Sequence, residues 1–176
     1  MRRFLGEDEN QPIRHPLIQA NVEPRILGVP LGDNHTGLED AVLIPGVGCP
    51  MGCNFCSTSA LFGGRGRSID FYQTGAELFE IMCGAENDLD AKGFFVMDEN
   101  FLLNKRRALE LLDLMERYNK PWYLKVFSSV DVIRNWTPDQ LVALGVAWIW
   151  MGLEGEDAHY RKLAGSDTRK LVRSLQ

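Results

Sequence analysis

Short apolar runs alternate with helical patterns over the greater part of this chain. The runs occupy residues 41–44, 93–97, 122–127 and 146–151, and each is rich in Val, Ile, Phe, Tyr or Trp. None shows the alternation of apolar and polar residues that marks a strand with one face in water, so we expect strands covered on both faces. Strands that alternate with helices predict β-α units and a parallel sheet.

Capping residues mark where the intervening helices begin. The predicted helix starts are at Thr74, Asn104, Thr137 and Asp167. Thr74 and Glu77 have the spacing of a capping box, and Gly84 predicts the end of that first helix. Pro138, directly after Thr137, suits the first position of a helix. The sequence therefore predicts an α/β fold of about four βα units.

The segment before the first strand has a different composition. Residues 1–40 contain four of the prolines and show no sustained period of a helix or strand. We expect an extended lead-in over residues 1–40, followed by a domain over residues 41–176. A full eight-stranded barrel needs about 250 residues, so the domain resembles the first part of a (β/α) barrel. A truncated barrel is the expectation, and a half-barrel that self-associates is the alternative.

Length, composition and charge narrow the classes of protein. The chain has 176 residues, of which 45% are hydrophobic, so it can form a real core. Its net charge of -5 gives no general attraction to nucleic acid or to anionic membranes. The N-terminal stretch lacks the apolar centre of a signal peptide, and no apolar run reaches the roughly 18 residues that span a bilayer. We therefore expect a cytoplasmic protein.

Three of the four cysteines fall within residues 49–56, at Cys49, Cys53 and Cys56. Clustered thiolates are typical ligands of iron-sulfur clusters, zinc or copper. A structural zinc site usually takes four protein ligands, and a ferredoxin motif has a fourth cysteine nearby. Three ligands on a four-iron cluster leave one iron open for substrate or cofactor. A zinc knuckle or a chance cluster is the alternative.

The spacing Cys49-x3-Cys53-x2-Cys56, with Phe55 before the last cysteine, resembles the signature of the radical S-adenosylmethionine (SAM) enzymes. That resemblance implies a 4Fe-4S cluster on the three cysteines, with SAM bound to the open iron. In that family an electron from the cluster cleaves SAM to methionine and a 5'-deoxyadenosyl radical, which abstracts hydrogen from the substrate. It also implies a full or partial barrel, a flavodoxin or ferredoxin-type reductant, and Phe55 against the adenine.

Polar residues follow each predicted strand, where parallel folds bind ligands. Asp98-Glu99-Asn100 resembles a segment of the cobalamin-associated branch of the same family that binds the SAM amino group. Gly152-Leu153-Glu154-Gly155 resembles its Gly-x-Glu-Ser-Gly segment, which makes Glu154 a candidate SAM contact, as is Ser128. The alternative for 98–100 and Ser128 is helix capping. The branch further implies methyl or methylthio transfer, whereas the substrate cannot be identified.

Other residues of chemical interest receive plainer interpretations. Cys83 is interpreted as a small apolar residue, and the run 105–107, Lys-Arg-Arg, as a solvated helix face. His15 has no neighbouring pattern that assigns it a role. The competing function is a non-enzymatic protein, either an iron-sulfur carrier or sensor or a zinc-stabilised binding module.

Overall fold

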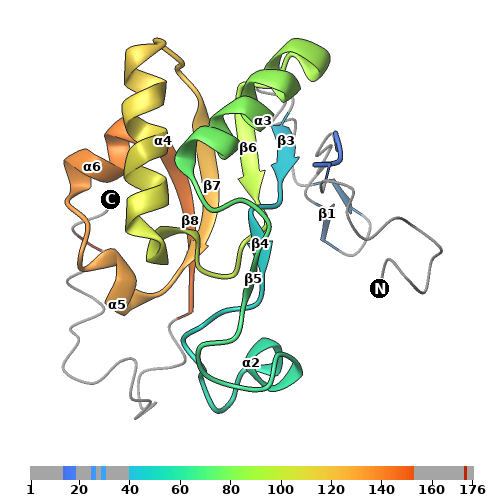
Figure 1. Ribbon diagram of the computed structural model, residues 1–176, viewed down its shortest axis with the longest axis vertical. Coiled ribbons are helices and arrows are strands. Elements are labelled where there is room, and N and C mark those ends of the chain that lie inside the picture. Colours follow the sequence, from blue (N-terminus) through green and yellow to red (C-terminus); the bar gives the residue numbers. More distant parts are fainter. Residues whose placement is uncertain (1–13, 19–24, 27–28, 31–39, 153–172, 174–176) are drawn as a thin grey trace.

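A computed structural model describes residues 14–18, 25–26, 29–30, 40–152 and 173. Its main sheet has four strands in the order β3-β6-β7-β8, and every neighbouring pair is parallel (Figure 1). The strands are β3 (Asp40–Leu43), β6 (Gly93–Val96), β7 (Tyr123–Ser128) and β8 (Val146–Met151). The prediction of a mixed α/β fold with a parallel sheet is confirmed. No end of a predicted strand lies more than one residue from the observed end.

Helices connect these strands, and three of them begin at the predicted caps Thr74, Asn104 and Thr137. The connecting helices are α3 (Gly75–Leu89), α4 (Lys105–Arg117), α5 (Val130–Ile133) and α6 (Pro138–Ala143). Thr74 and Thr137 both form capping boxes, and the Asn104 side chain accepts a hydrogen bond from the Arg107 N–H. These caps satisfy backbone donors that a helix start otherwise leaves unpaired. None of the helices among the described residues has the length and apolar character needed to cross a bilayer.

Several local predictions need correction. Helix α3 does not end at Gly84 but continues to Leu89, because the apolar face extends to the buried Ala85. Its cap is Asp90, in the left-handed conformation with φ of 52°. The short helix α5 was not predicted, and neither were β1 (Arg25–Ile26), β2 (Val29–Pro30), β4 (Gly46–Val47), β5 (Ile69–Asp70), α2 (Ser57–Leu61) and the 3-10 helix η1 (Phe101–Leu103). The helix expected from Asp167 lies outside the described residues.

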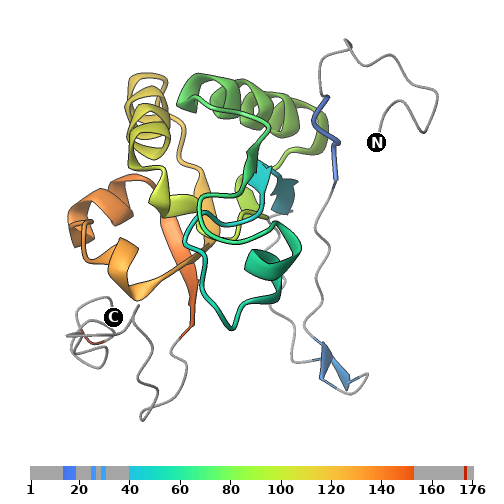
Figure 2. The same cartoon turned by 60° about the horizontal axis from the view of Figure 1, so that its bottom comes forward.

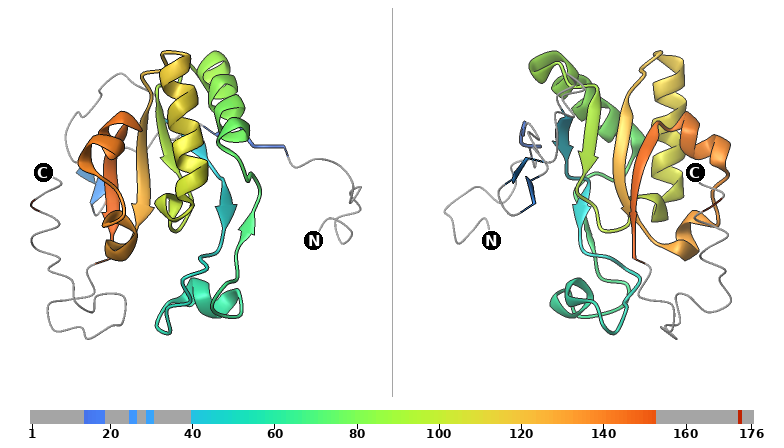
Figure 3. Two further views of the ribbon diagram at one scale, coloured as in Figure 1. Left: turned by 60° about the vertical axis from the view of Figure 1, so that its left-hand side comes forward. Right: turned by 180° about the vertical axis from the view of Figure 1, so that it is seen from behind.

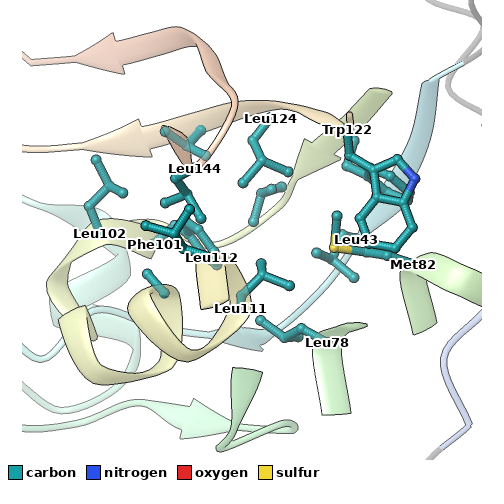
Figure 4. Close-up of a cluster of buried hydrophobic side chains, with 14 of the residues drawn as sticks. Leu43, Leu78, Met82, Phe101, Leu102, Leu111, Leu112, Trp122, Leu124 and Leu144 are labelled. Carbon is teal, nitrogen blue, oxygen red and sulfur yellow. The ribbon is translucent and has the colours of Figure 1, made fainter. Parts of the chain in front are cut away.

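The core lies between the sheet and its helices. Figure 3 shows α3 and α4 side by side against one face of the sheet. Alternate strand residues such as Leu43, Val96 and Leu124 are fully buried on that face. They contact Leu78 of α3 and Leu111 of α4 in one apolar cluster (Figure 4). Burial of such side chains is the main favourable contribution to the stability of a domain of this size.

The opposite face of the sheet carries aromatic side chains. Phe127 and Trp150 stack with ring centroids 5.1 Å apart, and Phe95 meets Trp150 edge-on at 5.2 Å. Trp148 and Trp150 remain 56% and 38% exposed. The expectation that both faces are covered is therefore wrong for the described residues. Strands that follow chain order, joined by crossovers of one hand, place every connecting helix on the same face.

The dependence of stability on acidic pH tests the ion pairs that Glu86 of α3 forms with its neighbours. The Glu86 carboxylate pairs with Lys92 and with Lys120, each at 2.5 Å. Burial raises the pKa of Glu86, but hydrogen bonds from Lys120 and Lys92 outweigh it and lower the pKa from 4.5 to about 2. The lowered pKa means that these ion pairs stabilise the fold above pH 4.5. That stabilisation is lost as the pH falls toward 2.

We expect Glu86→Gln to lower the free energy of unfolding at pH 7 by on the order of 2 kcal/mol, after allowance for the partly exposed ammonium groups. The difference from wild type should shrink between pH 4.5 and 2. Urea denaturation across this range measures it, with Asp88→Asn on the exposed face of the same helix as control. A difference that stays constant from pH 7 to pH 3 would contradict this role of Glu86.

Candidate functional site

The cysteines lie in a loop at the carboxyl end of the parallel sheet. Strand β4 follows β3 after two residues and pairs with β5 in an antiparallel ladder, Gly46 opposite Asp70 and Val47 opposite Ile69. This ladder closes residues 48–68, which we call the cysteine loop. Figure 1 shows the loop and its helix α2 beyond the ends of β3 and β6, and Figure 2 brings this end forward. Parallel folds place ligand sites at this end.

Backbone contacts fold the cysteine loop onto itself. The N–H of Gly66 donates to the carbonyl of Pro50 at 2.9 Å. Gly52 has a φ of +69°, and a Cβ there would lie 2.5 Å from the Cα of Arg65. Only glycine combines this backbone conformation with such a close approach. The two arms of the loop therefore meet just beside Cys53.

Two of the predicted ligands and one carboxylate lie close enough to the third predicted ligand, Cys49, to act on it electrostatically. Cys49, Cys53 and Cys56 are all partly buried free thiols. Burial raises the pKa of Cys49, and the nearby thiols of Cys53 and Cys56 and the carboxylate of Glu99 raise it further, against a hydrogen bond from the Met51 backbone. Mutual repulsion of this kind arises when several anionic groups share one place. A bound cation or cationic cluster relieves it.

Cys56 has the opposite electrostatic environment. It is the N-cap residue of α2. Backbone N–H groups of Ser59 and Thr58, together with their hydroxyls, lower the pKa of Cys56 despite some burial. Donors at a helix start stabilise a thiolate. The thiolate form, which binds metals, is thus favoured at one of the three cysteines.

The segment after β6 contains two acidic residues with different environments. Asp98 accepts hydrogen bonds from Arg107 Nη2 at 2.7 Å and from the Asn100 N–H at 3.0 Å. Glu99 is exposed, and its charge acts on Cys49. Asp98 is therefore held by the protein itself, whereas Glu99 is exposed and close enough to Cys49 for its charge to act there.

Asn100 and Ser128 are buried and bond to each other across the ends of β6 and β7. The Ser128 hydroxyl donates to Asn100 Oδ1 at 3.0 Å, and Asn100 Nδ2 donates to the Ser129 hydroxyl at 3.2 Å. Their exposures are 6% and 7%. Such buried, mutually satisfied polar groups order a loop. Asn100 and Ser128 therefore hold the ends of β6 and β7 together, and both side chains are buried.

Phe55 lies in the cysteine loop between Cys53 and Cys56 and is 41% exposed. Glu154 lies outside the described residues. Cys83 packs against the core from α3, in agreement with its interpretation as an apolar residue.

Arg107 is a residue that the sequence analysis missed. It was interpreted as part of a solvated face, but its side chain is only 2% exposed and pairs with Asp98. The signal was present in the helical period, because residue 107 is one turn before the buried Leu111. Position 107 faces the protein interior although it belongs to a run of three basic residues.

His15 in the lead-in contacts the chain between β3 and β4, just before the cysteine loop. Its Nε2 accepts a hydrogen bond from the Ile44 N–H at 2.8 Å, and Val42 donates to the Ile18 carbonyl at 2.8 Å. Burial lowers the pKa of His15, which favours the neutral ring that this acceptor role requires. No local sequence pattern predicts such a long-range contact.

The donor set of the cysteine loop can be compared with the metal groups that thiolates bind. Among the described residues, no three or more His, Cys, Asp or Glu side chains are arranged to hold a metal ion. A four-iron cluster attaches each thiolate to a different iron, so its ligands stand farther apart than those of one tetrahedral ion. Three reduced thiols on one closed loop fit such a cluster in number and in chemistry.

Comparison with known proteins gives one partial similarity. No protein-family model matches the chain. A protein of Pyrococcus horikoshii that is named an uncharacterized methyltransferase is 32% identical over 115 residues. The match covers 60% of this chain and 23% of that protein. The chain thus spans about a quarter of the length of this relative.

Proposed function

We propose that this chain is part of a radical SAM enzyme, in which Cys49, Cys53 and Cys56 hold a 4Fe-4S cluster and SAM binds at the open iron. One observation carries the proposal. Three free thiols lie on one closed loop at the carboxyl end of a parallel sheet, and the charges of Cys53, Cys56 and Glu99 all act on Cys49. A 4Fe-4S cluster supplies the electron that cleaves SAM when it is bound.

The chain's own residues then bind and orient SAM. Glu99 offers an exposed carboxylate, which suits the SAM ammonium through a charge-assisted hydrogen bond. Phe55 offers a partly exposed aromatic ring in the cysteine loop, which suits the adenine. Asn100 and Ser128 brace the segment that carries Glu99. Glu154 is proposed as a further SAM contact from the motif alone.

The fold and the similarity support the wider assignment. Four parallel strands in chain order with helices on one face are compatible with a partial (β/α) barrel, in which the aromatic face would lie inside. The relative's name supports an enzyme of methyl transfer, so we propose hydrogen abstraction or methyl or methylthio transfer as the reaction. A flavodoxin or ferredoxin-type protein in the cytoplasm would supply the electron.

Binding of labelled SAM separates this function from its competitors. Equilibrium dialysis under anaerobic conditions should show SAM bound to cluster-loaded protein and not to cluster-free protein. Glu99→Gln should weaken binding about tenfold, since it removes the charge that meets the ammonium. Glu80→Gln, an exposed carboxylate on α3, is the matched control and should change nothing.

Each competing function has its own result in this experiment. Equal SAM binding with and without the cluster would contradict a radical SAM site and favour a methyltransferase that binds SAM by protein contacts alone. A loaded cluster with no SAM binding would favour an electron carrier or sensor. Zinc in place of iron would favour the binding module.

A further inference from the structure

Arg107 is a charged side chain in the protein interior, where desolvation of a charge costs free energy. It is 2% exposed and lies 5.5 Å from the ring of Phe101. A buried guanidinium needs charged or polar partners to offset its desolvation. Its position at the start of α4, among the apolar residues that face the sheet, calls for a specific reason.

The partners of Arg107 come from two segments that flank the proposed site. Nη2 donates to the Asp98 carboxylate at 2.7 Å, in the segment after β6. Nη1 donates to the Tyr72 carbonyl at 3.0 Å and lies 3.9 Å from the Asp70 carboxylate, where the cysteine loop ends. The planar guanidinium thus spans two chain segments that are remote in sequence.

This arrangement binds one of two neighbouring carboxylates and leaves the other exposed. Arg107 and the Asn100 N–H occupy the two oxygens of Asp98. The next residue, Glu99, is left exposed with its charge acting on the Cys49 thiol. We propose that Arg107 is a positioning residue, which fixes residues 98–100 against the end of the cysteine loop and so holds Glu99 at the place where SAM binds. This inference rests on the proposed function.

Lysine in place of Arg107 retains the positive charge but lacks the two separate NH2 groups of the guanidinium. An ammonium is a single point and can bond either Asp98 or the Tyr72 carbonyl, so Arg107→Lys should uncouple the two segments. Arg106→Lys, its exposed neighbour, is the matched control. A second variant, Arg107→Met with Asp98→Leu, removes the pair without leaving a buried charge, a replacement that often preserves stability.

Hydrogen exchange measures the coupling without cluster or SAM. The Phe71 and Tyr72 amides donate to the Pro45 carbonyl at 2.9 and 3.1 Å, and the Asn100 amide donates to Asp98. In Arg107→Lys, the amides of both segments should exchange about tenfold faster or more, while β7 amides exchange as in wild type. In the double variant, which also removes the acceptor of the Asn100 amide, the Phe71 and Tyr72 amides give the readout and should exchange faster to the same extent. Arg106→Lys should exchange as wild type throughout.

SAM affinity supplies the second readout. With the iron content unchanged, cluster-loaded Arg107→Lys should bind SAM about tenfold more weakly, because Glu99 is no longer held in place. Loosening of only one segment or of neither, or SAM affinity within about twofold of wild type, would overturn the inference. If loaded wild type binds no SAM, the proposed function fails, and the paired exchange alone decides whether Arg107 joins the two segments.

Discussion

Gly75→Ala is expected to destabilise the protein by about 3 kcal/mol or more, because α3 and α4 touch backbone to backbone at this residue. A Cβ at Gly75 would lie 2.3 Å from the Leu111 backbone nitrogen and 2.6 Å from the Arg107 carbonyl oxygen. Neither atom belongs to a flexible side chain that can move aside. The Gly75 N–H also donates to the Glu110 carboxylate at 3.0 Å. The two helices would have to separate.

Gly84→Ala is the matched control on the same helix. No heavy atom lies within 4 Å of a Cβ placed at Gly84. Alanine there should stabilise the protein by about 0.5 to 1 kcal/mol, since glycine in a helix interior costs backbone entropy. Urea denaturation measures both variants. Effects of the same sign and size would contradict the close contact between α3 and α4.

Cys53→Ser is expected to remove most of the iron and sulfide that the protein takes up on anaerobic reconstitution. Serine is nearly the same size but lacks the soft thiolate that iron-sulfur clusters prefer. Cys49→Ser and Cys56→Ser should behave alike, since each would leave only two ligands in the loop. Iron and sulfide per chain, together with the visible absorption of the cluster, measure the loss.

Cys83→Ser is the control for the loop cysteines. Cys83 lies on α3 against the core, where burial raises the pKa of its thiol. The variant should keep the iron content of wild type. Full cluster content in Cys53→Ser, or equal loss in Cys83→Ser, would show that the loop does not supply the ligands.

The elements with local signals could be predicted from sequence. Strand β8 matches its predicted range, because a run of apolar and aromatic residues indicates a strand even where, as here, several of its side chains remain exposed. Thr74 and Thr137 carry their capping signals within four residues. Gly84 misled the prediction of the end of α3, because a glycine in a helix interior looks like a stop signal.

In the candidate site, too, features with a local sequence signal could be predicted and long-range contacts could not. The three cysteines are apparent from their spacing, since they lie on one loop. The different environments of Asp98 and Glu99 depend on Arg107, which lies on the following helix. Its buried position could not be predicted from a run of three basic residues. The contact of His15 with Ile44 joins residues 29 positions apart. Contacts of this kind follow from tertiary packing and leave no local pattern.

The most direct test of the central claim is electron paramagnetic resonance of the dithionite-reduced protein, reconstituted anaerobically with iron and sulfide, with and without SAM. We predict the signal of a reduced four-iron cluster that shifts when SAM is added and is absent in Cys53→Ala. A shift requires SAM to reach an iron that the protein leaves open. Stoichiometric zinc with no cluster uptake, or a cluster signal that SAM does not change, would contradict the account.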